Sequence, residues 1–180
     1  MDVSYFRECF SYFPESGALV WRVRPREHFA IERTWKIWNT RFSGKPTRLT
    51  PDTNGYRILR LTIDGRTHQW RVHRIIFALQ TGRWPSADID HKNRVRDDNR
   101  WVNLRPATRA ENVQNTLQRH NASGLPGVWW SRRQCKWWAR IQTAGKRKHL
   151  GSFLTAEEAH ASFLTAKAQM HPFSLEACGG

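Results

Sequence analysis

The chain has 180 residues and a formal net charge of +15, with 30 Lys and Arg against 15 Asp and Glu. Its length allows one mid-sized domain or two small ones, and so positive a charge is typical of proteins that bind polyanions, nucleic acid first. Three widely spaced cysteines indicate neither a disulfide framework nor a cysteine zinc site, and we find no signal peptide and no membrane span. We therefore expect a cytoplasmic protein with no membrane partner.

The first third of the chain is predicted to be rich in short strands. Residues 1–24 give a short amphipathic segment and then a small hairpin, or two short strands, around the turn PESG. Residues 25–54 are polar and basic, and we interpret them as a loop region with one short helix near Trp35 and Trp38. Such a region would also suit an additional DNA-contacting loop.

A hairpin and a helix follow. The runs YRILRLTI and RTHQWRV flank Asp64-Gly65, a pair that favours the two-residue type I′ turn between antiparallel strands. HRIIFALQTG then predicts an apolar helix that ends at Gly82. After a polar run, Thr108 and Glu111 predict a capping box that opens the helix AENVQNTL.

The polar run is IDHKNRVRDDNRWVNLR, residues 89–105. Carboxylate and amide oxygens suit a hard cation such as Mg²⁺, and Asp90 and Asn112 could supply them. His91 could remove a proton from water, because an imidazole is largely neutral near pH 7. From this pattern alone, nuclease chemistry and a plain polar loop between two helices are about equally supported.

The stretch over residues 72–115 resembles the HNH endonucleases of phages and mobile introns. The resemblance is carried by His73-Arg74, Ile89-Asp90-His91, Asp98-Asn99-Arg100, Asn103-Leu104-Arg105 and Glu111-Asn112. It implies a ββα-metal fold in which Asp90 and Asn112 hold one divalent cation, Mg²⁺ or alternatively Mn²⁺. His91 would be the general base and Asn103 would orient it, and no structural zinc is implied.

Other polar residues near this run are weaker candidates for catalysis or phosphate binding. His73 begins a helix among apolar neighbours, so a core or capping role is favoured over a catalytic one. Arg74, Arg100 and Arg105 could hold phosphates, although charges near a turn usually lie on a solvated surface.

The last third predicts a sheet with one covered and one open face. VWWS, WWARIQT and KRKHLGSF read as three strands, and Thr155 with Glu158 predicts a capping box for the helix AEEAHASFLTAKAQM. Alternation places Trp137, Ala139 and Ile141 under this helix. The open face would present basic and aromatic groups to a DNA groove. Its predicted DNA-binding residues are Arg133, Trp138, Arg140, Gln142, Arg147 and His149.

Residues 123–171 resemble the AP2 DNA-binding domain. The Gly-Val start, the W-A-x-I strand, HLGSF and TAEEAH carry the resemblance. It implies a three-stranded sheet lying in the major groove. The acidic and arginine positions of the plant pattern are only partly kept, so no base preference is carried over.

Together these patterns predict an α+β protein with two domains. A nuclease domain would contain a β-rich region, residues 1–72, and an HNH core, residues 73–117. A linker over 118–126 would join it to an AP2-like domain over 127–180.

The expected function is hydrolysis of double-stranded DNA by a monomeric, free-standing homing endonuclease of a phage or mobile element acting in a bacterial host. The alternatives are a DNA-binding regulator with an inactive nuclease fold and an RNA-binding or RNA-cleaving protein. A sheet suited to the B-form major groove disfavours RNA.

Overall fold

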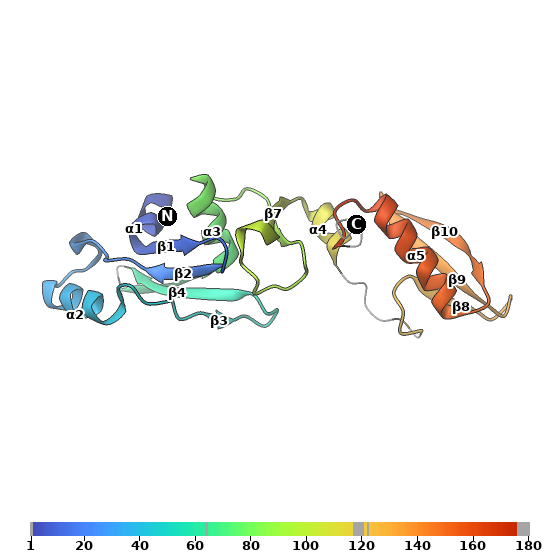
Figure 1. Ribbon diagram of the computed structural model, residues 1–180, viewed down its shortest axis with the longest axis horizontal. Coiled ribbons are helices and arrows are strands. Elements are labelled where there is room, and N and C mark those ends of the chain that lie inside the picture. The colour runs from blue at the N-terminus through green and yellow to red at the C-terminus, as the bar shows by residue number, and fades with distance from the viewer. Residues whose placement is uncertain (1, 64, 117–120, 122, 176–180) are drawn as a thin grey trace. The chain divides into compact units, whose positions relative to one another are not determined.

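The structure is a computed structural model that describes residues 2–63, 65–116, 121 and 123–175 (Figure 1). The chain forms two compact units, Met1–Pro106 and Ala107–Gly180. Each unit combines helices with small antiparallel sheets, so the predicted α+β class is confirmed. The predicted linker lies partly outside the described residues, and a functional division there stays a prediction.

The described residues of the first unit form three small sheets and three α-helices. Its elements are α1 (Val3–Cys9), β1 (Phe10–Phe13), β2 (Ala18–Trp21), a 3-10 turn (Arg26–His28), α2 (Glu32–Phe42), β3 (Thr50–Pro51), β4 (Arg57–Ile63), β5 (Arg66–Arg71), α3 (Val72–Thr81), β6 (Asp88–His91), a second 3-10 turn (Trp101–Asn103) and β7 (Leu104–Ala107). β1 pairs with β2, β4 lies between β3 and β5, and β6 pairs with β7. The β-rich region therefore also contains α1 and α2.

The best-predicted elements of this unit are those that the sequence marks with a turn or a terminal glycine. β4 and β5 form the expected antiparallel hairpin, while Asp64 of its predicted type I′ turn lies outside the described residues. α3 ends where expected, because Gly82 has a φ of 78°, a left-handed conformation that a glycine adopts without a steric penalty.

The short helix expected near Trp35 and Trp38 is present as α2, which takes up eleven residues in the centre of the region 25–54. Trp35, Trp38 and Phe42 fall on one helical stripe of α2. The Trp38 ring packs edge-on against Trp21, with their centroids 4.8 Å apart.

The core of the first unit lies around α3. Val72, Ile75 and Ile76 on this helix are fully buried, and they pack in one cluster with Leu59 of β4 and Phe6 of α1. Burying residues of this size stabilises a fold by about 1.5–3 kcal/mol each. The same cluster holds β6 and β7, the strands that carry the polar run, against α3.

The second unit is a helix-covered sheet preceded by a short helix. Its elements are α4 (Arg109–Asn115), β8 (Val128–Ser131), β9 (Lys136–Thr143), β10 (Lys146–Phe153) and α5 (Ala156–Met170). Both predicted capping boxes are present, at Thr108–Glu111 and at Thr155–Glu158. The strands form an antiparallel sheet in the order β10-β9-β8, as the three strand-like runs predicted.

α5 covers one face of this sheet. Ala139 and Ile141 of β9 are buried, and they pack in clusters with Ala159 and Phe163 of α5, which confirms the predicted covered face. The other face carries the alternate residues of β9 and is not covered by α5.

The short helix α4 is hydrogen-bonded to the segment that follows α5 in the same unit. The side-chain oxygen of Gln114 accepts a hydrogen bond from the backbone N–H of Phe173, at 3.4 Å. That of Asn115 accepts one from the backbone N–H of Leu175, at 3.1 Å. Within the described part of the chain, no helix has the length and apolar run that crossing a membrane requires.

Candidate catalytic site and candidate DNA-binding face

β6 ends in the two residues at the centre of the predicted site. Asp90 is 6% exposed and His91 is 3% exposed, so both polar side chains are buried. Buried polar groups are kept only where they find partners, because losing water is costly. The hydrogen-bond partners of these two side chains therefore indicate the chemical role of each.

His91 is held by an amide and by two aromatic rings. Its Nε2 lies 3.2 Å from Oδ1 of Asn99, which is also buried. Because an amide oxygen only accepts, Nε2 must carry the hydrogen, and the lone pair of the neutral ring is on Nδ1. The rings of Tyr56 and His73 lie 5.7 and 5.1 Å away between centroids.

Burial lowers the pKa of His91, and the hydrogen bond to Asn99 and the charges of Asp90 and Asp98 oppose this shift. The neutral, proton-accepting form is favoured as a result. His73 lies in the core, as predicted, and burial together with the neighbouring His91 lowers its pKa to about 3.

Asn103 belongs to the same polar run as this histidine, but its amide forms its hydrogen bonds with backbone groups of the loop. Its Oδ1 accepts from the backbone N–H of Asn93 at 3.0 Å, and its Nδ2 donates to the backbone oxygen of Asp98 at 2.8 Å. The resemblance assigned the orienting role to Asn103, whereas the amide that contacts the imidazole is Asn99. Asn103 instead shapes the loop that carries Asn99.

A carboxylate organises the same loop. Asp98 accepts hydrogen bonds from Nε and Nη2 of Arg100, at 2.8 and 2.6 Å, and from Nδ2 of Asn93 at 2.7 Å. The hydrogen bonds from Arg100 lower the pKa of Asp98 to about 2. Arg100, a candidate for phosphate binding, is thus paired within the loop.

Asp90 is bound by an arginine from the neighbouring strand. Both Nε and Nη2 of Arg105 donate to its Oδ2, at 2.9 and 2.8 Å. Arg105 was a candidate for phosphate binding, and the structure places it on the predicted metal ligand. Arg74 also has a structural role, because it donates to the backbone oxygens of Pro85 and Ala87.

Asn112, the second predicted metal ligand, lies on α4 of the other unit and is half-buried. Its pairing with Asp90 therefore stays a prediction. Among the described residues, no three His, Cys, Asp or Glu side chains gather as a metal site of those residues would require. The predicted pair differs from such a site, since it combines one carboxylate with one amide.

The open face of the C-terminal sheet brings together most of the predicted DNA-binding residues. Arg140 and Gln142 on β9 pair with His149 and Arg147 on β10, so these side chains share one face. Trp138 lies on the same face, and the Arg140 guanidinium carbon is 4.4 Å from its ring centroid. This open face is defined below as Trp129, Trp138, Arg140, Gln142, Arg147 and His149.

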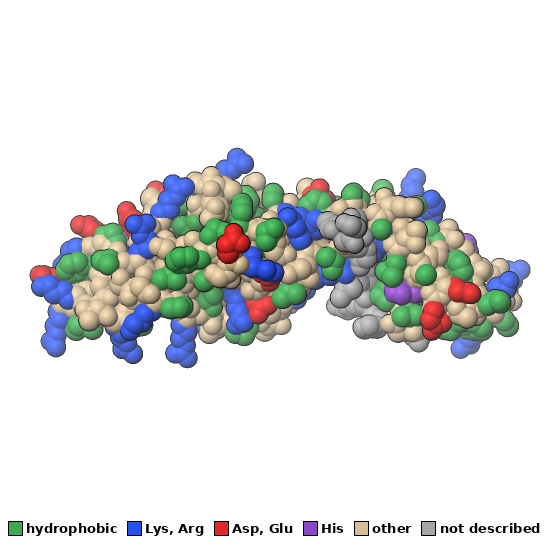
Figure 2. All heavy atoms as spheres, viewed as in Figure 1, with side chains coloured by type: hydrophobic (Ala, Val, Ile, Leu, Met, Phe, Trp, Pro, Cys, Tyr) green, Lys and Arg blue, Asp and Glu red, His purple; other side chains and the backbone are tan. Residues whose placement is uncertain are grey.

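The structure adds Trp129 to this face and moves Arg133 off it. Trp129 is 41% exposed and pairs across the strands with Trp138. Alternation after the buried Val128 could have identified it. Arg133 lies in the turn between β8 and β9 instead of on a strand. Lys and Arg side chains are visible on the surface of both units (Figure 2).

Comparison with known proteins identifies the segment that carries the buried site. Residues 71–114 match the family model of the HNH endonucleases, a span that includes Asp90, His91, Asn103 and Asn112. The match supports a DNA-cleaving hydrolase. More narrowly, residues 71–114 are similar to the HNH endonucleases.

A solved structure described as "DNA binding and cleavage by the HNH homing endonuclease I-HmuI" is 21% identical in sequence. The match has a TM-score of 0.44 and covers 83% of this chain and 75% of that chain. Comparison with curated proteins gives no match.

Proposed function

We propose that the protein is a metal-dependent endonuclease of the homing type that hydrolyses phosphodiester bonds of double-stranded DNA. The observation that carries the proposal is the buried His91, held through Nε2 by Asn99 beside the buried Asp90. A neutral imidazole in a fixed orientation is suited to remove a proton from an attacking water.

The side chains around His91 would divide the work between them. Nδ1 of His91 would take the proton, while Asn99 keeps the hydrogen on Nε2 and fixes the plane of the ring. Asn103 and Asp98 would act indirectly, by fixing the loop that carries Asn99. Arg105 would hold the carboxylate of the buried Asp90 in place.

The donor set fits a divalent cation. Asp90 would supply a carboxylate and Asn112 an amide, and such oxygen ligands suit Mg²⁺, with Mn²⁺ as the alternative. When bound, the cation would stabilise the negative charge that develops on the scissile phosphate.

The open face would supply most of the target preference, in the manner of an AP2 domain. Arg140 and Arg147 can bind phosphates or guanine edges, and the exposed ring of Trp129 and the half-buried ring of Trp138 can pack on sugars. With one nuclease site, a monomer would nick one strand, and a double cut would need a second binding event. By resemblance, the enzyme would act in a bacterial host as a phage or mobile-element protein.

One assay tests the proposal against the two alternatives. Supercoiled plasmid and a matched RNA are incubated with the wild-type protein in Mg²⁺, with the wild type in EDTA, and with His91→Ala in Mg²⁺. We expect broken plasmid only with the wild type in Mg²⁺, and intact RNA throughout. If the wild type and His91→Ala both bind DNA and neither breaks it with Mg²⁺ or Mn²⁺, the DNA-binding regulator is the better description.

A further inference from the structure

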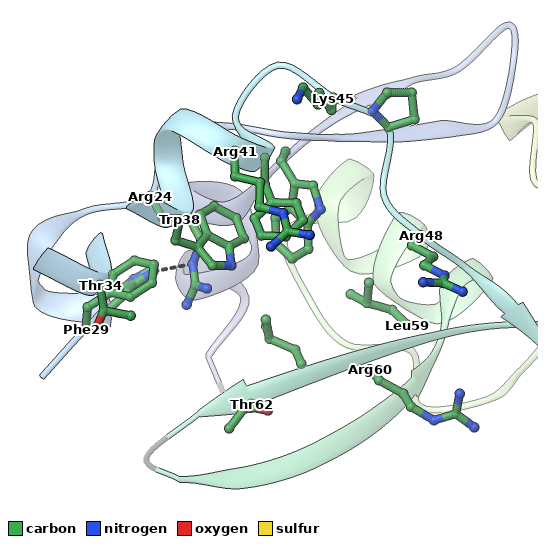
Figure 3. A pocket seen from close by; sticks show the side chains of 15 residues that line it. Arg24, Phe29, Thr34, Trp38, Arg41, Lys45, Arg48, Leu59, Arg60 and Thr62 are labelled. Carbon is green, nitrogen blue, oxygen red and sulfur yellow. Dashed lines mark hydrogen bonds between the residues drawn. The ribbon is translucent and has the colours of Figure 1, made fainter. Parts of the chain in front are cut away.

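A second site is suggested by a hollow in the first unit, between α2 and β4. It has a volume of about 710 Å³ and lies among residues for which the sequence predicted mainly a loop. Figure 3 shows Trp38 and Arg41 on the α2 side and Leu59, Arg60 and Thr62 along β4. The described residues that line it include no Asp or Glu.

The lining combines positive charge with aromatic rings. Its cationic side chains are Arg24, Arg41, Lys45, Arg48 and Arg60. Its aromatic side chains are Trp21, Phe29, Trp38 and Phe42. Proteins that bind single-stranded nucleic acid use this combination, because cations neutralise the phosphates and rings stack on the bases.

Arg24 places a buried positive charge in the wall of the hollow. Its side chain is buried, with Nε 3.4 Å from Nδ1 of His28 and Nη2 donating to the Tyr5 hydroxyl at 2.6 Å. The guanidinium carbon lies 4.6 and 4.8 Å from the ring centroids of Phe29 and Trp38. Among the described residues, no carboxylate forms an ion pair with it.

A buried guanidinium without a carboxylate is costly, because neither water nor a counter-ion fully compensates its charge. An anionic group in the hollow would provide the missing charge. The exposed Arg41 and Arg48 would hold the same group from outside. The site is therefore built for an anion that also carries an apolar or aromatic part.

The size of the hollow narrows the choice further. Pockets of roughly 300–1,000 Å³ hold small molecules, so one nucleotide can enter but a duplex cannot. We propose that the hollow binds one unpaired nucleotide of a DNA strand, with its phosphate at Arg24 and the outer arginines and its base against the rings. The choice of DNA rests on the proposed function, whereas the binding requires neither cleavage nor a metal.

The test uses the full chain carrying His91→Ala, in EDTA, so that no DNA is cut. A single-stranded oligonucleotide with one 2-aminopurine reports base stacking through loss of its fluorescence. We expect saturable quenching, and we expect Arg41→Gln with Arg48→Gln to weaken binding at least about tenfold, because two phosphate contacts are lost.

Two matched pairs of substitutions serve as controls. Arg33→Gln with Arg66→Gln removes the same charge from exposed positions outside the hollow, and Arg140→Gln with Arg147→Gln removes it from the open face. The pair Arg33→Gln with Arg66→Gln should weaken binding of the single strand less than about threefold, and the pair on the open face should weaken it less than the hollow pair does. All variants should keep the melting temperature of the parent, since the replaced arginines of the hollow are exposed.

Other outcomes would overturn the proposal. If either control pair weakens binding as much as the hollow pair, the effect is one of total charge or belongs to the open face. If a free deoxynucleoside monophosphate, added at the same concentration as the oligonucleotide, displaces the oligonucleotide, the ligand is a free nucleotide.

The proposal for the hollow is separable from the nuclease proposal. Quenching that persists in a protein found unable to cut DNA would reject the nuclease proposal and retain this one.

Discussion

The buried site around His91 and the open face of the C-terminal sheet use polar residues in opposite ways. His91, Asp90 and Asn99 are almost inaccessible, and each has a side-chain partner at a defined atom. Arg140 and Arg147 lie on a surface that water reaches. A buried polar group is useful for its orientation, whereas an exposed one contributes charge that salt can screen. The two regions should therefore respond differently to substitution.

The largest effect should come from His91. His91→Ala should lower the single-turnover cleavage rate about 10²–10⁴-fold, the usual contribution of a general base, and should leave the affinity for duplex DNA almost unchanged. His68→Ala, which alters an exposed histidine of β5, is the matched control. Unchanged cleavage in His91→Ala would remove this residue from the mechanism.

Substitutions on the open face should give the reverse pattern. Arg140→Gln with Arg147→Gln should raise Kd for duplex DNA roughly tenfold and lower the slope of log K against log salt by roughly 1.8, about 0.9 for each lost phosphate contact. Titrations at several salt concentrations measure both. The cleavage rate at saturating protein should not change, and a slope equal to that of the wild type would argue against phosphate contacts here.

The two asparagines near His91 should differ from each other. Asn99→Ala removes the hydrogen-bond partner of His91 Nε2. We expect kcat to fall about tenfold, less than on loss of the general base itself, and KM to stay unchanged. Asn103→Ala should mainly lower the melting temperature, because its amide bonds only loop groups. Equal effects on kcat and on stability for both variants would contradict the separate roles.

The smallest effect concerns the loop itself. Asp98→Asn should lower the free energy of unfolding at pH 7 by about 1–2 kcal/mol, because hydrogen bonds to a charged group are weakened. The pKa of Asp98 falls from its ordinary value of 3.8 to about 2 in the folded protein. Its contribution is therefore complete above the ordinary value and is lost as the pH falls to about 2.

Melting curves of the wild type and Asp98→Asn should accordingly differ at neutral pH and converge in that acidic range. A difference that stays constant down to about pH 2, the folded-state pKa of Asp98, would mean that the charge of Asp98 does not stabilise the loop.

Elements with strong local signals could be predicted from the sequence. The β4–β5 hairpin, α3 and α5 each combine regular apolar spacing with a turn, a terminal glycine or a capping box. α2 was expected only as a short helix near Trp35 and Trp38, because its polar residues outnumber the three aromatic ones of its half-buried stripe. Local patterns predict elements only where composition and periodicity agree.

Contacts within the site were harder to predict. The polar run contains the amides of Asn93, Asn99 and Asn103, and only the path of the loop decides that Asn99 meets His91. The contact between Arg105 and Asp90 depends on the pairing of β6 with β7. Residue types indicated the chemistry, but the partner of each side chain required the fold.

The attachment of α4 by Gln114 and Asn115 to the backbone after α5 bears on how the protein can be dissected. α4 carries Asn112, and the family match runs into this helix. Under the proposed function, a deletion intended to remove only the sheet β8–β10 and α5 would also take away the anchor of the helix that carries the predicted metal ligand. Loss of cleavage on such a truncation would then follow from the lost anchor of α4 as well as from lost DNA binding.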